Sequence, residues 1–181
     1  MFTTQLVVEE LNGKAMEALN KGNTVWLMAD PGAVDTSVKL GFSSIFWNTA
    51  WTSGQAPHTL GILCDPGHPA LEAFPTEYHS NWQWWDAMHQ GQVITLNEFE
   101  NRIEPIVRII DDWFENRSLG LIFEARVGEG KIIVCGTDLL TDLERRMEAK
   151  QLLYSLESYM ASDHFQPKSE ISLTELESLS R

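Results

Sequence analysis

Short apolar runs that end at turn signals constrain the fold of this chain more than any other feature of its sequence. Residues 24–29 (TVWLMA) and 60–64 (LGILC) are each followed by Asp-Pro-Gly, a sequence typical of turns. A run that is apolar throughout indicates a strand buried on both faces, which is typical of parallel sheets. Further strands are predicted over residues 5–8, 92–96, 106–110, 119–127 and 131–135. The last two flank Gly-Glu-Gly and predict a hairpin-like pair at an antiparallel edge of the sheet.

Helix signals alternate with these predicted strands. The clearest helix is predicted over residues 141–160, where Thr141 and Glu144 have the spacing of a capping box. Its apolar face consists of Leu143, Met147, Leu152, Leu156 and Met160. Alternating strands and helices favour an α/β domain with three layers and a mostly parallel central sheet. We expect residues 1–161 to form this domain and residues 162–181 to form a polar linker and an amphipathic C-terminal tail.

Composition and charge exclude several classes of function. The 181 residues, 43% of them apolar, suit one domain with a sizeable core. The formal net charge is −13 and no cluster of Lys and Arg interrupts it, so we expect no nucleic-acid partner. No apolar run reaches the roughly 18 residues of a bilayer-spanning helix, so we expect no membrane span. The first residues lack the features of a secretion signal, and the sequence leaves the localisation open.

The residue types that carry catalysis and metal binding show no productive spacing. Cys64 and Cys135 fit no disulfide framework or zinc motif, and neither has the small neighbours of a nucleophile elbow. The histidines lack the close paired spacing of a metal site, and no glycine-rich phosphate motif is present. Asp111 and Asp112 are adjacent, so on a strand they would point to opposite faces rather than flank one bond. We therefore expect no catalytic residue, no metal and no cofactor in this chain.

Seven tryptophans are the most unusual feature of the composition. Aromatic side chains offer flat apolar faces on which a sugar ring or a partner surface stacks. The candidate ligand-binding surface consists of Trp47, Trp51, Tyr78, Trp82, Trp84 and Trp85. Hydrogen bonds to the hydroxyl groups of a sugar would come from His58, Glu77, His79 and Asp86. The alternative is that these aromatic residues form a second small core under a long loop.

Most of the chain resembles the C-terminal region of large bacterial β-galactosidase-like proteins of glycoside hydrolase family 2. The segments that carry the resemblance are residues 42–51 (FSSIFWNTAW), 54–65 (GQAPHTLGILCD), 68–86 (HPALEAFPTEYHSNWQWWD), 110–121 (IDDWFENRSLGL), 130–139 (GKIIVCGTDL) and the tail from 146 to 176. The His-Pro and Phe-Pro pairs within residues 68–75 also resemble a segment of trehalose-utilisation (ThuA-like) proteins. This second likeness implies a flavodoxin-like or class I glutamine-amidotransferase-like fold.

The resemblance implies a non-catalytic accessory domain in a carbohydrate-degrading system, because the β-galactosidase chemistry of that family belongs to a separate barrel domain. Such a domain would pack on a glycoside hydrolase catalytic domain, self-associate into an oligomer, or contact carbohydrate. A periplasmic or extracellular localisation follows if the parent enzyme is exported. The alternative is a small ThuA-like sugar-metabolising enzyme with its site at the strand ends, although no cysteine elbow here matches the catalytic motif of active amidotransferases.

Overall fold

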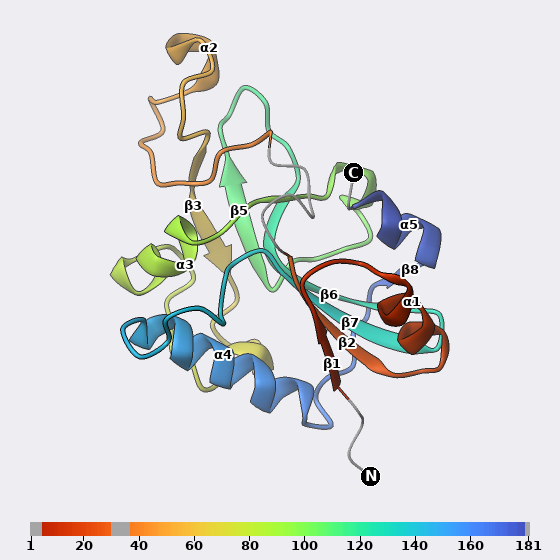
Figure 1. Ribbon diagram of the computed structural model, residues 1–181. Coiled ribbons are helices and arrows are strands. Elements are labelled where there is room, and N and C mark those ends of the chain that lie inside the picture. Colours follow the sequence, from red (N-terminus) through yellow and green to blue (C-terminus); the bar gives the residue numbers. More distant parts are fainter. Residues whose placement is uncertain (1–4, 30–36, 180–181) are drawn as a thin grey trace.

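A mixed β-sheet organises the molecule (Figure 1). The computed structural model describes residues 5–29 and 37–179. Six strands follow the order β1-β2-β7-β6-β5-β3, and the short strands β4 and β8 both pair with β6. The strands are β1 (Gln5–Val8), β2 (Thr24–Met28), β3 (Thr59–Cys64), β4 (Ile94–Thr95), β5 (Val107–Asp111), β6 (Leu119–Val127), β7 (Gly130–Cys135) and β8 (Glu170–Ile171).

Most strand pairings in this sheet are antiparallel. The pairs β1–β2, β2–β7 and β6–β8 are parallel, whereas β3–β5, β4–β6, β5–β6 and β6–β7 are antiparallel. The predicted three-layer α/β domain with a mostly parallel sheet, flavodoxin-like or class I glutamine-amidotransferase-like, is therefore wrong. The physical reason is connection length, because a parallel pair needs a crossover of about a dozen residues or more. Residues 112–118 and 128–129, which join β5 to β6 and β6 to β7, are too few for that.

Helices contribute less to the molecule than the sheet does. The α-helices are α1 (Gly13–Asn20), α2 (Thr49–Thr52), α3 (Trp85–His89), α4 (Met147–Met160) and α5 (Leu173–Ser178), and the 3₁₀-helices are η1 (Pro69–Leu71), η2 (Trp82–Trp84) and η3 (Asn97–Phe99). Within the described ranges only α4 exceeds two helical turns by a clear margin. The protein is thus β-rich, and its helices serve mainly to cover the two faces of the sheet.

Each face of the sheet carries its own apolar core. On β2, Trp26 and Met28 enter one core, whereas Val25 and Leu27 enter the other, because successive side chains of a strand point to opposite faces. The first core is closed by η1, α3 and α4, and the second by α1, η3 and α5. Figure 1 shows α4 and α1 on opposite sides of the central strands. Burial of both faces explains why β2 lacks the polar alternation of a half-exposed strand.

The segment between β7 and α4 is a turn rather than the first turn of a helix. The predicted helix over residues 141–160 begins only at Met147, and no side chain caps its N-terminus. Arg146 donates from its guanidinium to the carbonyl oxygens of Asp138 and Thr141, at 2.6 and 2.9 Å. Asp142 has a positive φ of 53°, which helical backbone does not allow. This tertiary role of Arg146 overrides the local capping signal.

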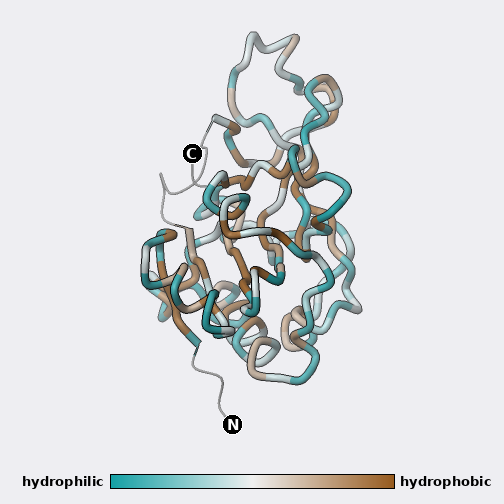
Figure 2. The backbone as a smooth tube through the Cα atoms, turned by 90° about the vertical axis from the view of Figure 1, so that its right-hand side faces the viewer, coloured by the Kyte–Doolittle hydropathy of each residue, from teal (hydrophilic) through white to brown (hydrophobic). Residues whose placement is uncertain are grey.

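The C-terminal residues return to the sheet. In β8, Ile171 joins the core on the α1 side, and Leu176 of α5 is buried in the same core. Ser172 and Glu175 form a capping box at the start of α5. Figure 2 shows the apolar segments passing through the middle of the molecule, with hydrophilic turns around them.

Candidate functional site

A pocket of about 570 Å³ lies where the parallel strands β2 and β7 end. The backbone N–H of Ala29, just after β2, donates to the carbonyl oxygen of Cys135 at 2.9 Å and so holds the two strand ends together. The carboxyl ends of neighbouring parallel strands are a common location for ligand crevices. We call this cavity the strand-end pocket; its lining includes Met28, Ala29, Leu40, His89, Gln92 and Thr137.

Two facing segments, 90–92 and 136–138, build one wall of the strand-end pocket. The N–H of Gln92 donates to the oxygen of Gly136 at 2.7 Å, and the N–H of Asp138 donates to the oxygen of Gln90 at 3.0 Å. A side chain at Gly136 would collide with the carbonyl oxygen of Gln92. Glycine is therefore required here for close approach of the backbones.

Two polar atoms in this pocket have no hydrogen-bond partner among the described residues: Gln92 Oε1 and Thr137 Oγ1. The amide nitrogen of Gln92 is engaged, since it donates to the carbonyl oxygen of Ala29. Thr137 is only 1% exposed, so its hydroxyl is cut off from bulk solvent. Buried polar groups are normally satisfied by protein, water or ligand.

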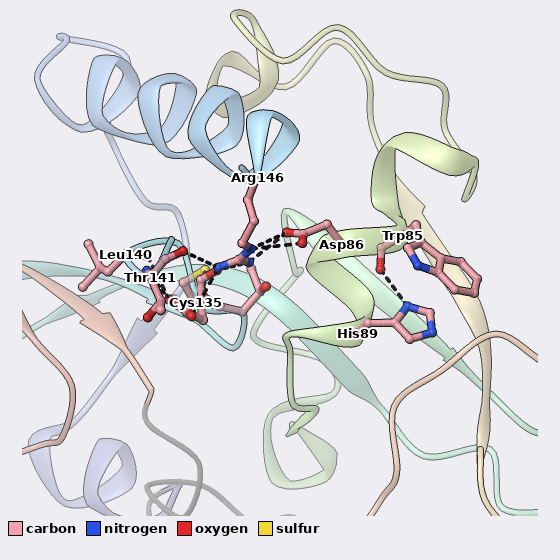
Figure 3. Close-up of polar contacts among 9 residues, drawn as sticks. Trp85, Asp86, His89, Cys135, Leu140, Thr141 and Arg146 are labelled. Carbon is pink, nitrogen blue, oxygen red and sulfur yellow. Dashed lines mark hydrogen bonds and ion pairs between the residues drawn. The ribbon is translucent and has the colours of Figure 1, made fainter. Parts of the chain in front are cut away.

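An ion-pair network connects the pocket wall to α3 (Figure 3). The guanidinium of Arg146 contacts Asp86 at 2.8 Å and Asp138 at 3.2 Å. Burial acts to raise the pKa of Asp138, but N–H donors of Leu140 and Thr141 and the charge of Arg146 lower it overall. Asp138 is therefore a carboxylate at neutral pH. Asp86, predicted from the sequence as a ligand contact, instead serves to hold α3 against the start of α4.

An aromatic ledge adjoins this pocket and consists of Phe42, Trp82, Trp85 and His89. The ring of Trp85 lies nearly parallel to that of Phe42, with centroids 5.8 Å apart, and it stacks on His89 at 3.8 Å. Trp82 contacts Trp85 at 5.2 Å. Trp82 is 82% exposed and Trp85 is 47% exposed, so both present ring surface to solvent. His89 lies beside Trp85 on α3 (Figure 3) and also lines the strand-end pocket, so it connects the ledge to the pocket.

Trp84, the tryptophan between the two ledge tryptophans, belongs to the core. It is fully buried, its Nε1 donates to Thr76 Oγ1 at 2.8 Å, and its ring meets Phe74 edge to face. The side chain therefore offers no surface to a ligand. Trp84 packs in the large core that α4 covers, not in a second small core of its own.

The remaining predicted ligand contacts lie elsewhere. Trp47 and Trp51 belong to the segment around α2, which Figure 1 shows at the top of the molecule. His58 is occupied by backbone, since its Nε2 lies 3.0 Å from the oxygen of Gly54 and its Nδ1 accepts from the N–H of Lys39. The structure does not bring these three residues to the ledge.

Glu77, Tyr78 and His79 form an exposed group next to the end of β3. His79 lies 3.4 Å from Glu77, and its ring contacts Tyr78. The carbonyl oxygen of Tyr78 accepts from the N–H of Cys64, which holds the segment on the sheet. Of the ten sequence-predicted contacts, only Trp82 and Trp85 thus meet with their rings at the ledge.

Several residues of the site escaped sequence reasoning. Gln92 and Thr137 carry no motif, and their proximity follows from the pairing of segments 90–92 and 136–138. A usable signal was the position of Thr137 just after an apolar run, where parallel strands place their ligand crevice. Phe42 gives no such signal.

In residues 5–29 and 37–179, no three His, Cys, Asp or Glu side chains are arranged to hold a metal ion.

Residues 6–181 match a family model described as Domain of unknown function (DUF8487). No curated protein matches this chain. None of the helices in the described part of the chain has the length and apolar character that crossing a bilayer requires.

Proposed function

We propose that this chain, which belongs to the DUF8487 family, is a non-catalytic accessory module that contacts carbohydrate within a glycoside hydrolase family 2 β-galactosidase-like system. The observation that carries the proposal is the aromatic ledge. Trp82 and Trp85 expose ring faces beside a pocket lined by Gln92 and Thr137, whose Oε1 and Oγ1 atoms lack partners among the described residues. A pyranose needs this combination, because it has an apolar face and a rim of hydroxyl groups.

Two ionisable groups, Asp138 in the lining of the strand-end pocket and Cys135 nearby at the end of β7, favour binding over catalysis. Asp138, held by Arg146 and by two N–H donors, has a lowered pKa and would be a poor general acid at neutral pH. Burial raises the pKa of Cys135 to about 12, so its thiol is a poor source of nucleophilic thiolate. Neither group is therefore suited to general-acid or nucleophilic catalysis.

The test is a titration of the folded protein with lactose and with plant cell-wall oligosaccharides, followed by tryptophan fluorescence and by saturation-transfer NMR. Saturable binding that W82A and W85A each weaken at least ten-fold would support the proposal. W113A is the matched control, since Trp113 is exposed but its ring contacts Phe114 instead of the ledge. Absence of binding by every sugar, or binding that the ledge variants leave intact, would refute a sugar site here.

A second candidate function, packing on a partner domain or self-association, is favoured by an apolar tip around α2. The exposed residues of this tip are Ile45, Phe46, Trp47, Trp51, Trp113 and Phe114. Asp112 joins the two segments that supply them, because its Oδ2 accepts from the N–H and hydroxyl of Thr49 at 2.9 and 2.6 Å. Exposed apolar patches of this kind mark protein interaction sites.

Sedimentation velocity separates these roles. Self-association through the tip predicts a concentration-dependent oligomer that F46S and W51S abolish. Y154S is the control, because Tyr154 is an exposed aromatic residue on α4, outside the tip. If the protein is a monomer at all concentrations, the same experiment is repeated with a glycoside hydrolase catalytic domain added. Failure to bind that domain as well would exclude a packing role for the tip.

A further inference from the structure

A second cleft, of about 650 Å³, lies at the opposite end of β3 from the α2 tip and is independent of the ledge. We call it the tail cleft, because residues 164–169 of the C-terminal segment form one side. The other sides come from the end of β3, the start of β5, β6 and the last turn of α4. The polar lining used below consists of Asp65, His68, Glu104, Arg108, Glu124 and Lys168.

Arg108 is the unusual member of this lining. It is half-buried on β5, and its guanidinium makes no hydrogen bond or ion pair with any described residue. The arginines that do pair with carboxylates are Arg102, Arg117, Arg126 and Arg146. In a chain with a net charge of −13, an arginine left without an internal carboxylate partner in a cleft needs explanation. A guanidinium is also the side chain best shaped to hold a carboxylate or phosphate.

Two further donors share the tail cleft with Arg108. Lys168 makes no hydrogen bond or ion pair in the described part of the chain, and it also lines an adjoining cavity together with Arg108. His68 Nδ1 accepts from the N–H of Ala70 at 3.2 Å, so the neutral ring carries its proton on Nε2. Burial, the largest influence, lowers the pKa of His68, which favours this neutral donor form.

An acceptor stands among these donors. Tyr159 donates its hydroxyl proton to Glu124 Oε2 at 2.7 Å, which leaves Glu124 Oε1 without a hydrogen-bond partner among the described residues. Burial raises the pKa of Glu124, the largest effect on it, against the opposing influence of Tyr159 and two lysines. Asp65 and Glu104 add negative charge at the cleft, which disfavours a ligand with many negative charges.

We infer that the tail cleft binds a small hydroxylated molecule bearing one carboxylate or phosphate group. Arg108 and Lys168 hold the anionic group, while His68 Nε2 and Glu124 Oε1 hydrogen-bond its hydroxyls. Charge-assisted hydrogen bonds from Arg108 supply the affinity. When the ligand binds, the guanidinium loses only hydrogen bonds to water and breaks no ion pair with a described carboxylate.

The experiment uses isothermal titration calorimetry of the full chain at pH 7.5 with galacturonate, galactose 6-phosphate and neutral galactose. Binding of either anionic sugar at least ten-fold tighter than galactose is expected, and the stronger of the two identifies the anion. R108Q should weaken that binding at least ten-fold. R126Q should leave it unchanged, because Arg126 is exposed and already paired with Glu170.

Three results would overturn the inference: no binding of either anion, equal binding of neutral galactose, or unchanged affinity in R108Q. If R108Q fails to fold by circular dichroism, K168Q replaces it, since Lys168 is exposed and makes no internal bond with a described residue. The variant W82A distinguishes the two sites. It removes sugar stacking at the ledge and should leave binding at the tail cleft intact, so either site can fail without the other.

Discussion

Replacement of Trp84 with alanine should destabilise the fold and leave the ledge able to bind. Trp84 is fully buried, and truncation of a buried Trp to Ala costs about 3–5 kcal/mol through lost burial and the remaining cavity. The edge-to-face contact with Phe74 and the hydrogen bond to Thr76 are lost as well. Since small domains have a total stability of roughly 5–15 kcal/mol, W84A should remain folded but be markedly weakened.

Urea denaturation followed by far-UV circular dichroism measures the effect. The midpoint should fall in W84A while the slope stays the same, because a cavity in the core changes stability rather than the surface exposed on unfolding. W82A is the matched control, since Trp82 is 82% exposed and its loss should change the free energy of unfolding by no more than about 0.5 kcal/mol. A loss below about 1 kcal/mol in W84A would show that this ring is not part of the core.

Two further predictions concern the loop anchor and the pocket wall. Burial acts to raise the pKa of Asp112, but hydrogen bonds from Thr49 and from the N–H groups of Glu115 and Phe114 lower it to about 2. An unfolded aspartate has a pKa of about 3.9, so the Asp112 carboxylate stabilises the fold fully above that pH. This contribution to the free energy of unfolding disappears as the pH falls through about 2. Urea midpoints measured between pH 5 and pH 2 should therefore change less with pH in D112N than in the wild type. At the wall, G136A should cost about 1–3 kcal/mol by thermal denaturation, because its methyl group meets the carbonyl of Gln92, and wild-type stability would contradict the required close approach.

Individual strands could be predicted from the sequence, and so could the antiparallel pairing of β6 with β7, but the directions of the other strands could not. The predicted edge position of this pair is wrong, because β6 and β7 lie in the middle of the strand order. The apolar runs at 24–29, 60–64, 119–127 and 131–135 coincide with β2, β3, β6 and β7, because burial on both faces leaves a local signature. Direction depends on connections and partners, which apolar content does not encode. The seven residues from 112 to 118 return the chain antiparallel. Asp111 holds this turn, because its carboxylate accepts three hydrogen bonds from Arg117, one from the backbone N–H and two from the guanidinium.

The candidate site was predictable only where local periodicity sufficed. Trp82 and Trp85 are three residues apart, a spacing that puts them on one face of a helical turn, and their rings do meet. Phe42, which stacks on Trp85, comes from a distant segment, so no local pattern could indicate it. A contact between distant parts of the chain also explains why the helix predicted to start at Thr141 begins only at Met147. Arg146, just before α4, pairs with Asp86, and no local pattern indicates this contact.

The order in which the sheet is assembled bears on how this protein is made in the cell. Strand β2 is flanked by β1, a close neighbour in sequence, and by β7, where Thr24 pairs with Lys131. A chain emerging from the ribosome therefore presents the apolar edge of β2 long before β7 has been synthesised. Pairings so distant in sequence slow folding, and an open strand edge invites association with other chains. Nascent chains that end before β7 should accordingly bind chaperones, and release should coincide with the emergence of the β6–β7 hairpin.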